Sequence, residues 1–157
     1  MILYSRLQNS PDLAPRLIGM SLTEFDSLFQ DFQKIHTRAI HQRQTTLRDS
    51  RPRLRGPGGG HRFKYDLQDR LLMALFWMAT RPTYSTLGQL YGLHRCSVEK
   101  MVRATRKTLQ ELDKRRFNFS HRTRGTHSSI PSLLAAFPEL QLLGHGITMN
   151  ELGGDPM

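Results

Sequence analysis

The chain has 157 residues, of which 38% are apolar, which is enough for one modest hydrophobic core. A formal net charge of +10 points to a polyanionic partner, nucleic acid before membrane. One cysteine excludes an internal disulfide framework and a Cys-x-x-Cys zinc site, and the apolar runs are too short for a signal peptide or for the roughly 18 residues of a membrane span.

Residues 1–20 carry Pro11, Pro15 and Gly19 among scattered leucines. Prolines and glycines at this density interrupt regular structure. We therefore expect an irregular or briefly helical lead with little function.

A long amphipathic helix is predicted from Ser21 onward. Ser21 with Glu24, or Thr23 with Asp26, has the spacing of a capping box. The apolar positions that follow keep helical spacing and are Phe25, Leu28, Phe29, Phe32, Ile35, Ala39 and Ile40. We expect this aromatic stripe to lie in the core or against a second copy of the chain, rather than to stack on bases.

The next segment, HQRQTTLRDSRPRLRGPGGGHRFKYD, is rich in arginine, glycine and proline and cannot bury a core. Two interpretations stay open for its basic loop, residues 48–64: a solvated linker, or an arm that follows phosphates or enters the minor groove. The candidate phosphate contacts in it are Arg51, Arg53, Arg55, Arg62 and Lys64. The glycines at 58–60 do not form a nucleotide-hydrolase phosphate loop, because no Gly-Lys-Ser/Thr follows.

A second helix, LQDRLLMALFWMAT, is expected to be the core of the domain. Asp66, with Asp69 three residues later, can cap its start. Its leucines form a broad apolar face, and Trp77 is expected to pack against a neighbouring helix. Arg81 and Pro82 should end it.

The stretch YSTLGQLYGLHRCSVEKMVRATRKTLQEL predicts two helices joined by a tight turn. The first starts at Thr83 or Ser85 and has apolar Leu87, Leu90 and Tyr91. Gly92 should end it, because glycine most readily adopts the left-handed conformation that terminates a helix. This is the pattern of a helix-turn-helix.

The second helix of this pair is the candidate DNA reader. Its apolar positions are Val98, Met101, Val102, Leu109 and Leu112, while its charged residues fall largely on other faces. A major groove admits one helix whose first turns face base edges. We therefore assign base contacts to Arg95, Ser97, Glu99 and Lys100, and phosphate contacts to Arg103, Arg106 and Lys107. The alternative is that these charges only solvate a surface helix.

Residues 116–157 are expected to form a basic loop, one short helix within LLAAFPELQLL and an irregular tail. The charges from Lys114 through SHRTRGTHSS either contact phosphates without specificity or form a solubilising connector.

No catalytic or metal site is expected. His36 and His41 are five residues apart and so lie on different faces of a helix. We interpret the late acids Glu139, Glu151 and Asp155 as solvated charges. Cys96 is expected in a small, half-buried position rather than as a nucleophile.

The order of these motifs resembles the N-terminal helix-turn-helix domain of DDE-superfamily insertion-sequence transposases. The matching features are Gly58 to Gly60, Asp66 and Asp69, Leu71 and Leu72, Pro82 and Thr83, Leu87 and Leu90, Tyr91-Gly92-Leu93, and Val98. The run LTEFDSLFQDF also resembles the first helix of that family, so the similarity covers roughly residues 20–115.

We expect an all-α chain of four or five helices built on a three-helix core, with the helix-turn-helix domain at 21–115. The resemblance implies that this domain recognises double-stranded transposon-end DNA. Transposases of this family cut DNA with three metal-binding acids in a separate domain, which this sequence lacks. We therefore expect no enzyme activity, cofactor, small-molecule ligand or membrane association.

The chain would be a truncated or frameshift-separated transposase product in the cytoplasm, associated with the nucleoid. Further candidate partners are a second copy of the chain and the full-length transposase. The alternatives are a stand-alone transcription regulator, and the DNA-binding part of a transposase whose catalytic domain is on another polypeptide.

Overall fold

The computed structural model describes residues 3–50, with side chains as far as residue 43, and residues 64–114 and 125–143. These residues form helices connected by turns, which confirms the predicted all-α class. The elements are α1 (Tyr4–Gln8), a 3-10 turn η1 (Pro11–Leu13), α2 (Ala14–Ile18), α3 (Leu22–Ser50), α4 (Leu67–Thr80), α5 (Tyr84–Tyr91), α6 (Arg95–Leu112), α7 (Ile130–Ala136) and α8 (Leu140–Leu143). The described residues thus contain more helices than the four or five predicted, because short helices flank the long ones.

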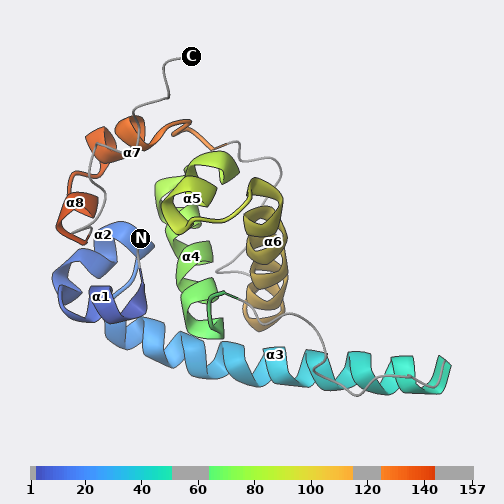
Figure 1. Ribbon diagram of the computed structural model, residues 1–157. Coiled ribbons are helices and arrows are strands. Elements are labelled where there is room, and N and C mark those ends of the chain that lie inside the picture. The colour runs from blue at the N-terminus through green and yellow to red at the C-terminus, as the bar shows by residue number, and fades with distance from the viewer. Residues whose placement is uncertain (1–2, 51–63, 115–124, 144–157) are drawn as a thin grey trace, which may run out of the picture.

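The long helix α3 lies beneath the other elements (Figure 1). Helices α4 and α6 rise from it side by side, and α5 contacts α6 at the far end. Helix α2 packs against α4, and α7 packs against α5. The last turns of α3 extend past α6 and away from the body of the molecule.

The N-terminal lead is briefly helical, which is one of the two forms that we expected, and it is packed against the rest of the chain. Leu7, Leu17 and Ile18 are buried in the main core. Pro11 opens the 3-10 turn, and Gly19 ends α2 in a left-handed conformation with φ of 76°. The prolines therefore lie at the starts of short helices and the glycine lies at the end of one, where each is compatible with helical structure.

The predicted capping box at the start of α3 is confirmed. The Ser21 amide donates to Glu24 Oε2 at 2.9 Å, and the Glu24 amide donates to Ser21 Oγ at 3.3 Å. Phe25 and Phe32 are buried, as expected for core residues.

The helix continues through residues 41–50 to Ser50, so residues 48–50 of the predicted basic loop, residues 48–64, are helical. Residues 41–50 contain no glycine or proline that would break a helix, and they include glutamine and arginine, which favour helices. The helix therefore continues beyond the last residues of its apolar stripe. Residues 51–63 of the predicted basic loop lie outside the described residues.

Helix α4 occupies the centre of the core. Its predicted cap is confirmed, because Asp66 Oδ1 accepts from the Asp69 amide at 2.8 Å. Every residue from Leu71 to Trp77 is buried, so α4 is enclosed on all faces rather than on one broad face. Trp77 stacks on Tyr84 with ring centroids 5.4 Å apart, which confirms that it packs against a neighbouring helix.

Two short helices replace the single one predicted near the C-terminus. Pro138 separates α7 from α8, because a residue that precedes proline disfavours the helical conformation. Leu140 and Leu143 are buried, and the Leu143 carbonyl accepts from Arg6 Nη1 at 2.9 Å. Arg16 forms an ion pair with Glu139, so α8 and the residue before it are held against α1 and α2. Glu139 is therefore a paired residue and not the solvated tail charge that we expected.

Candidate nucleic-acid interface

Helix α5 starts and ends where the sequence predicts. Thr83 is the N-cap, and its Oγ1 accepts from the Thr86 amide at 3.2 Å. Gly92 ends the helix in a left-handed conformation with φ of 58°. The Leu93 amide then donates to the Gly88 carbonyl at 2.9 Å, which closes the turn into α6.

The turn also depends on Gly88, a residue that the sequence did not single out. A Cβ atom at this position would lie 2.6 Å from the Leu93 carbonyl oxygen, closer than real Cβ atoms approach. The absence of a side chain lets the turn lie directly against α5. A glycine four residues before the turn glycine is the signal that could have identified it.

Lys64 and Tyr65, which precede α4, form hydrogen bonds to the turn between α5 and α6. Lys64 Nζ donates to the Gly92 carbonyl at 3.1 Å and to the Tyr91 carbonyl at 3.5 Å. The Tyr65 hydroxyl also donates to the Tyr91 carbonyl, and burial raises the pKa of both tyrosines. Lys64, which we predicted to contact phosphate, therefore donates its hydrogen bonds to carbonyls at the end of α5 that lack a partner within the helix.

Segment 125–128 supports α5 from the other side. The Thr83 amide donates to the His127 carbonyl at 2.9 Å, and the Thr126 amide donates to the Arg81 carbonyl at 2.8 Å. Gly125 is required here, because its Cβ would lie 2.5 Å from the Pro82 carbonyl oxygen. The turn from α4 into α5 is therefore held by residues more than 40 positions away in the sequence.

Helix α6 begins at an N-cap that the sequence analysis missed. His94 Nδ1 accepts from the Cys96 amide at 3.3 Å. Cys96 itself is exposed, so the predicted half-buried position is wrong. It lies in the first turn of α6.

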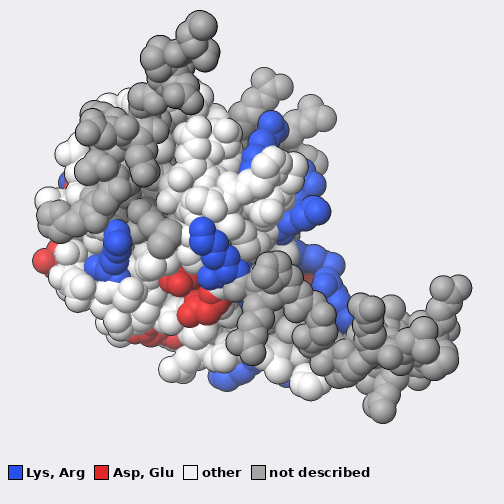
Figure 2. All heavy atoms as spheres, in the orientation of Figure 1, with Lys and Arg blue, Asp and Glu red and all other residues white. Residues whose placement is uncertain are grey.

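The two sides of α6 differ in chemistry, as the sequence predicts. Val98, Val102 and Leu109 are buried, and Met101 and Leu112 are partly buried against the core. The exposed side of α6 carries Arg95, Ser97, Lys100, Arg103 and Lys107. Figure 2 shows lysine and arginine gathered along the edge of the molecule where Figure 1 places α6.

Three predicted contact residues on α6 already have partners in the protein. Glu99 is half-buried and pairs with Arg103 through a 2.7 Å contact between Oε1 and Nη2. The Arg106 guanidinium lies 5.2 Å from the centroid of the Trp77 ring. Arg106 is half-buried on the side of α6 that faces α4, so it does not belong to the exposed side and we withdraw it as a phosphate contact.

The other predicted contacts, Arg51, Arg53, Arg55 and Arg62, lie outside the described residues. Among the residues that the structure describes, no group of three His, Cys, Asp or Glu side chains could hold a metal ion. No helix in the same ranges is long and apolar enough to cross a membrane.

Comparisons with protein-family models, with curated proteins and with solved structures found no match. The similarity to transposase DNA-binding domains therefore rests on the sequence motifs alone.

Proposed function

We propose that the chain binds double-stranded DNA by placing α6 in the major groove. The observation that carries this proposal is the two-sided character of α6: valine and leucine fix one side to the core, and the other side presents cations to solvent. A helix held in this way has the diameter and charge to enter a major groove.

The first turns of α6 would face the bases. Arg95 and Lys100 can donate to guanine O6 and N7, and the Ser97 hydroxyl can bond several bases. Glu99 could accept from cytosine N4, but it would first have to release Arg103. Farther along the helix, Arg103 and Lys107 would meet phosphates, which position the helix without reading sequence.

Helix α5 supports this assignment because it is fixed at both of its ends, one of which is the turn into α6. Lys64 and Tyr65 bond the end of α5, and segment 125–128 bonds its start. A reading helix must hold its side chains in register with base edges, so a fixed approach angle favours base recognition over loose charge attraction.

The more specific part of the proposal is that the DNA read is the end of a transposable element and that the chain is associated with the nucleoid. The motif order from the glycines at 58–60 to Val98 supports it. We propose no catalytic step for the chain.

Cys96 gives a direct test, because it is the single cysteine and is exposed in the first turn of α6. Duplexes would carry a thiol-reactive disulfide tether on cytosine N4, in the major groove, or on guanine N2, in the minor groove. We expect Cys96 to cross-link much faster to the major-groove tether.

The matched control moves the thiol to α3, in a Cys96→Ser, Ser27→Cys variant, and should show no preference between the two tethers. Equal rates for both tethers with the natural thiol would contradict the placement of α6.

A further inference from the structure

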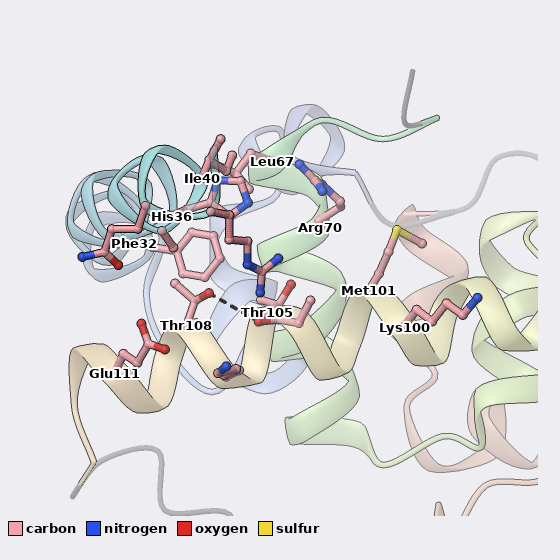
Figure 3. Close-up of a pocket in the computed structure, with 15 residues that line it drawn as sticks. Phe32, His36, Ile40, Leu67, Arg70, Lys100, Met101, Thr105, Thr108 and Glu111 are labelled. Carbon is pink, nitrogen blue, oxygen red and sulfur yellow. Dashed lines mark hydrogen bonds between the residues drawn. The ribbon is translucent and has the colours of Figure 1, made fainter. Parts of the chain in front are cut away.

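A cleft of about 720 Å³ lies beside the contact of α3 with α6, and α4 forms its back wall (Figure 3). Phe32, Leu67 and Met101 give it an apolar lining. Thr105 and Thr108 of α6 point toward α3 across this space. Ile40 stands at the α3 wall with 42% of its surface exposed, which is high for an isoleucine.

Cations from three helices line the same cleft. They are Arg43 of α3, Arg70 of α4, and Lys100 and Lys107 of α6. Among the described residues that line the cleft, Glu111 is the one acid. Four positive charges against one negative charge favour an anionic occupant.

His36 of α3 lines the cleft together with these cations, and its pKa responds to their charge. Its ring stacks on Phe32, with centroids 6.0 Å apart. Burial lowers the pKa of His36, and the positive charges of Arg70 and Arg43 lower it further. The cations of α3 and α4 therefore act on the interior of the cleft as well as on the outer surface.

We infer that the cleft holds a stretch of the sugar–phosphate backbone of the duplex that α6 contacts, so that α3 and α4 contribute phosphate contacts beside the reading helix. This inference rests on the proposed function. Lys100 and Lys107 both line the cleft and belong to the exposed side of α6, so the two surfaces are continuous. Phosphates would meet Arg43, Arg70 and Lys107, and the deoxyribose faces would pack on Met101 and Ile40.

The test compares two exposed arginines of α3. Arg43 lines the cleft, whereas Arg38 does not, so Arg43→Ala and Arg38→Ala remove the same charge from the same helix. Duplex affinity would be measured between 50 and 200 mM salt. Removing one phosphate contact makes the slope of log affinity against log salt shallower by about 0.9. The factor by which affinity falls between 50 and 200 mM salt then becomes roughly 3.5-fold smaller. We expect this change for Arg43→Ala and no change for Arg38→Ala.

A second readout follows the His36 ring by nuclear magnetic resonance in the wild-type chain. A phosphate in the cleft favours the imidazolium, so binding of the duplex should raise the pKa of His36. His41 lies one and a half turns farther along α3, is exposed and does not line the cleft, so it is the internal control.

The outcomes separate the two proposals. If the wild-type chain binds duplex, and Arg43→Ala behaves as Arg38→Ala does, the cleft inference is wrong and the proposed function stands. If the wild-type chain binds no duplex, both are wrong. If an acidic amphipathic peptide raises the pKa of His36 and duplex does not, the cleft is a protein-binding site and the inference is overturned.

Discussion

Replacing Gly88 with alanine should damage both the fold and DNA binding. Alanine is favoured over glycine inside a helix by about 1 kcal/mol, so helix propensity alone predicts a more stable protein. The new Cβ would lie 2.6 Å from the Leu93 carbonyl oxygen, and this neighbour is backbone held by the bond from the Leu93 amide to the Gly88 carbonyl. Overpacking of this kind costs roughly 1 to 3 kcal/mol, with a backbone clash toward the upper end. We expect a net loss of about 1 to 2 kcal/mol in the free energy of unfolding, after the gain in propensity is subtracted.

Gly19→Ala is the matched control for Gly88→Ala. Gly19 has φ of 76° and no atom within 4 Å of a built Cβ, so alanine there meets conformational strain without a clash. That strain costs roughly 1 to 2 kcal/mol. Both variants would be unfolded in urea and followed by circular dichroism, and their affinity for duplex would be measured under conditions where both are folded.

Both variants should be destabilised, but only Gly88→Ala should also lose affinity for duplex, because it moves the turn that aims α6. A Gly88→Ala protein as stable as the wild type, with unchanged duplex affinity, would refute the claim that this close contact fixes the turn.

Three further perturbations test other parts of the structure. Arg95→Ala or Lys100→Ala should lower the preference for a specific duplex over a random one by about 1 to 3 kcal/mol, and an equal loss on both duplexes would contradict base contact. Thr83→Ala should lower the free energy of unfolding by about 1 kcal/mol in urea titrations, because the first turn of α5 loses its cap, and no change would refute the capping role. The pKa of His36 is lowered in the folded chain, so the unfolded chain binds the proton of this residue more readily. The contribution of neutral His36 to the free energy of unfolding is therefore fully present above its ordinary pKa of 6.5 and is lost as the pH falls below that value. His36→Gln should therefore be less sensitive than the wild type to acidification from pH 7 to pH 5, and identical pH dependence in the two proteins would contradict this assignment.

Local signals in the sequence were enough to predict the ends of several helices. The Ser21–Glu24 box, the Asp66 cap and the turn at Gly92 each involve residues within four positions of one another. Interactions of this range are set by backbone geometry and do not depend on the rest of the fold. The apolar spacing of α6 was informative for the same reason.

Contacts between distant segments could not be predicted in this way. Nothing near Arg6 indicates that its guanidinium bonds the Leu143 carbonyl, 137 residues away. The position of Arg106 over Trp77 likewise depends on how α4 packs against α6. A basic residue on a predicted helix has the same sequence signature whether it meets phosphate or an aromatic ring, and only tertiary packing separates the two.

The length of α3 was underestimated for a related reason. The prediction followed the apolar stripe and stopped at Ile40, whereas the helix continues on polar residues to Ser50. The cleft between α3 and α6 was also not predicted, because it is formed by residues from three helices that meet only in the folded chain.

The central claim is that α6 reads the sequence of double-stranded DNA. The most direct measurement is selection of bound duplexes from a random pool by the purified chain, near physiological salt and with excess nonspecific competitor. We predict that one motif is enriched, and that Lys100→Ala changes the base preference at one position within it. Binding that appears only at low salt, with no enriched sequence, would contradict the claim and leave α6 as a nonspecific basic surface.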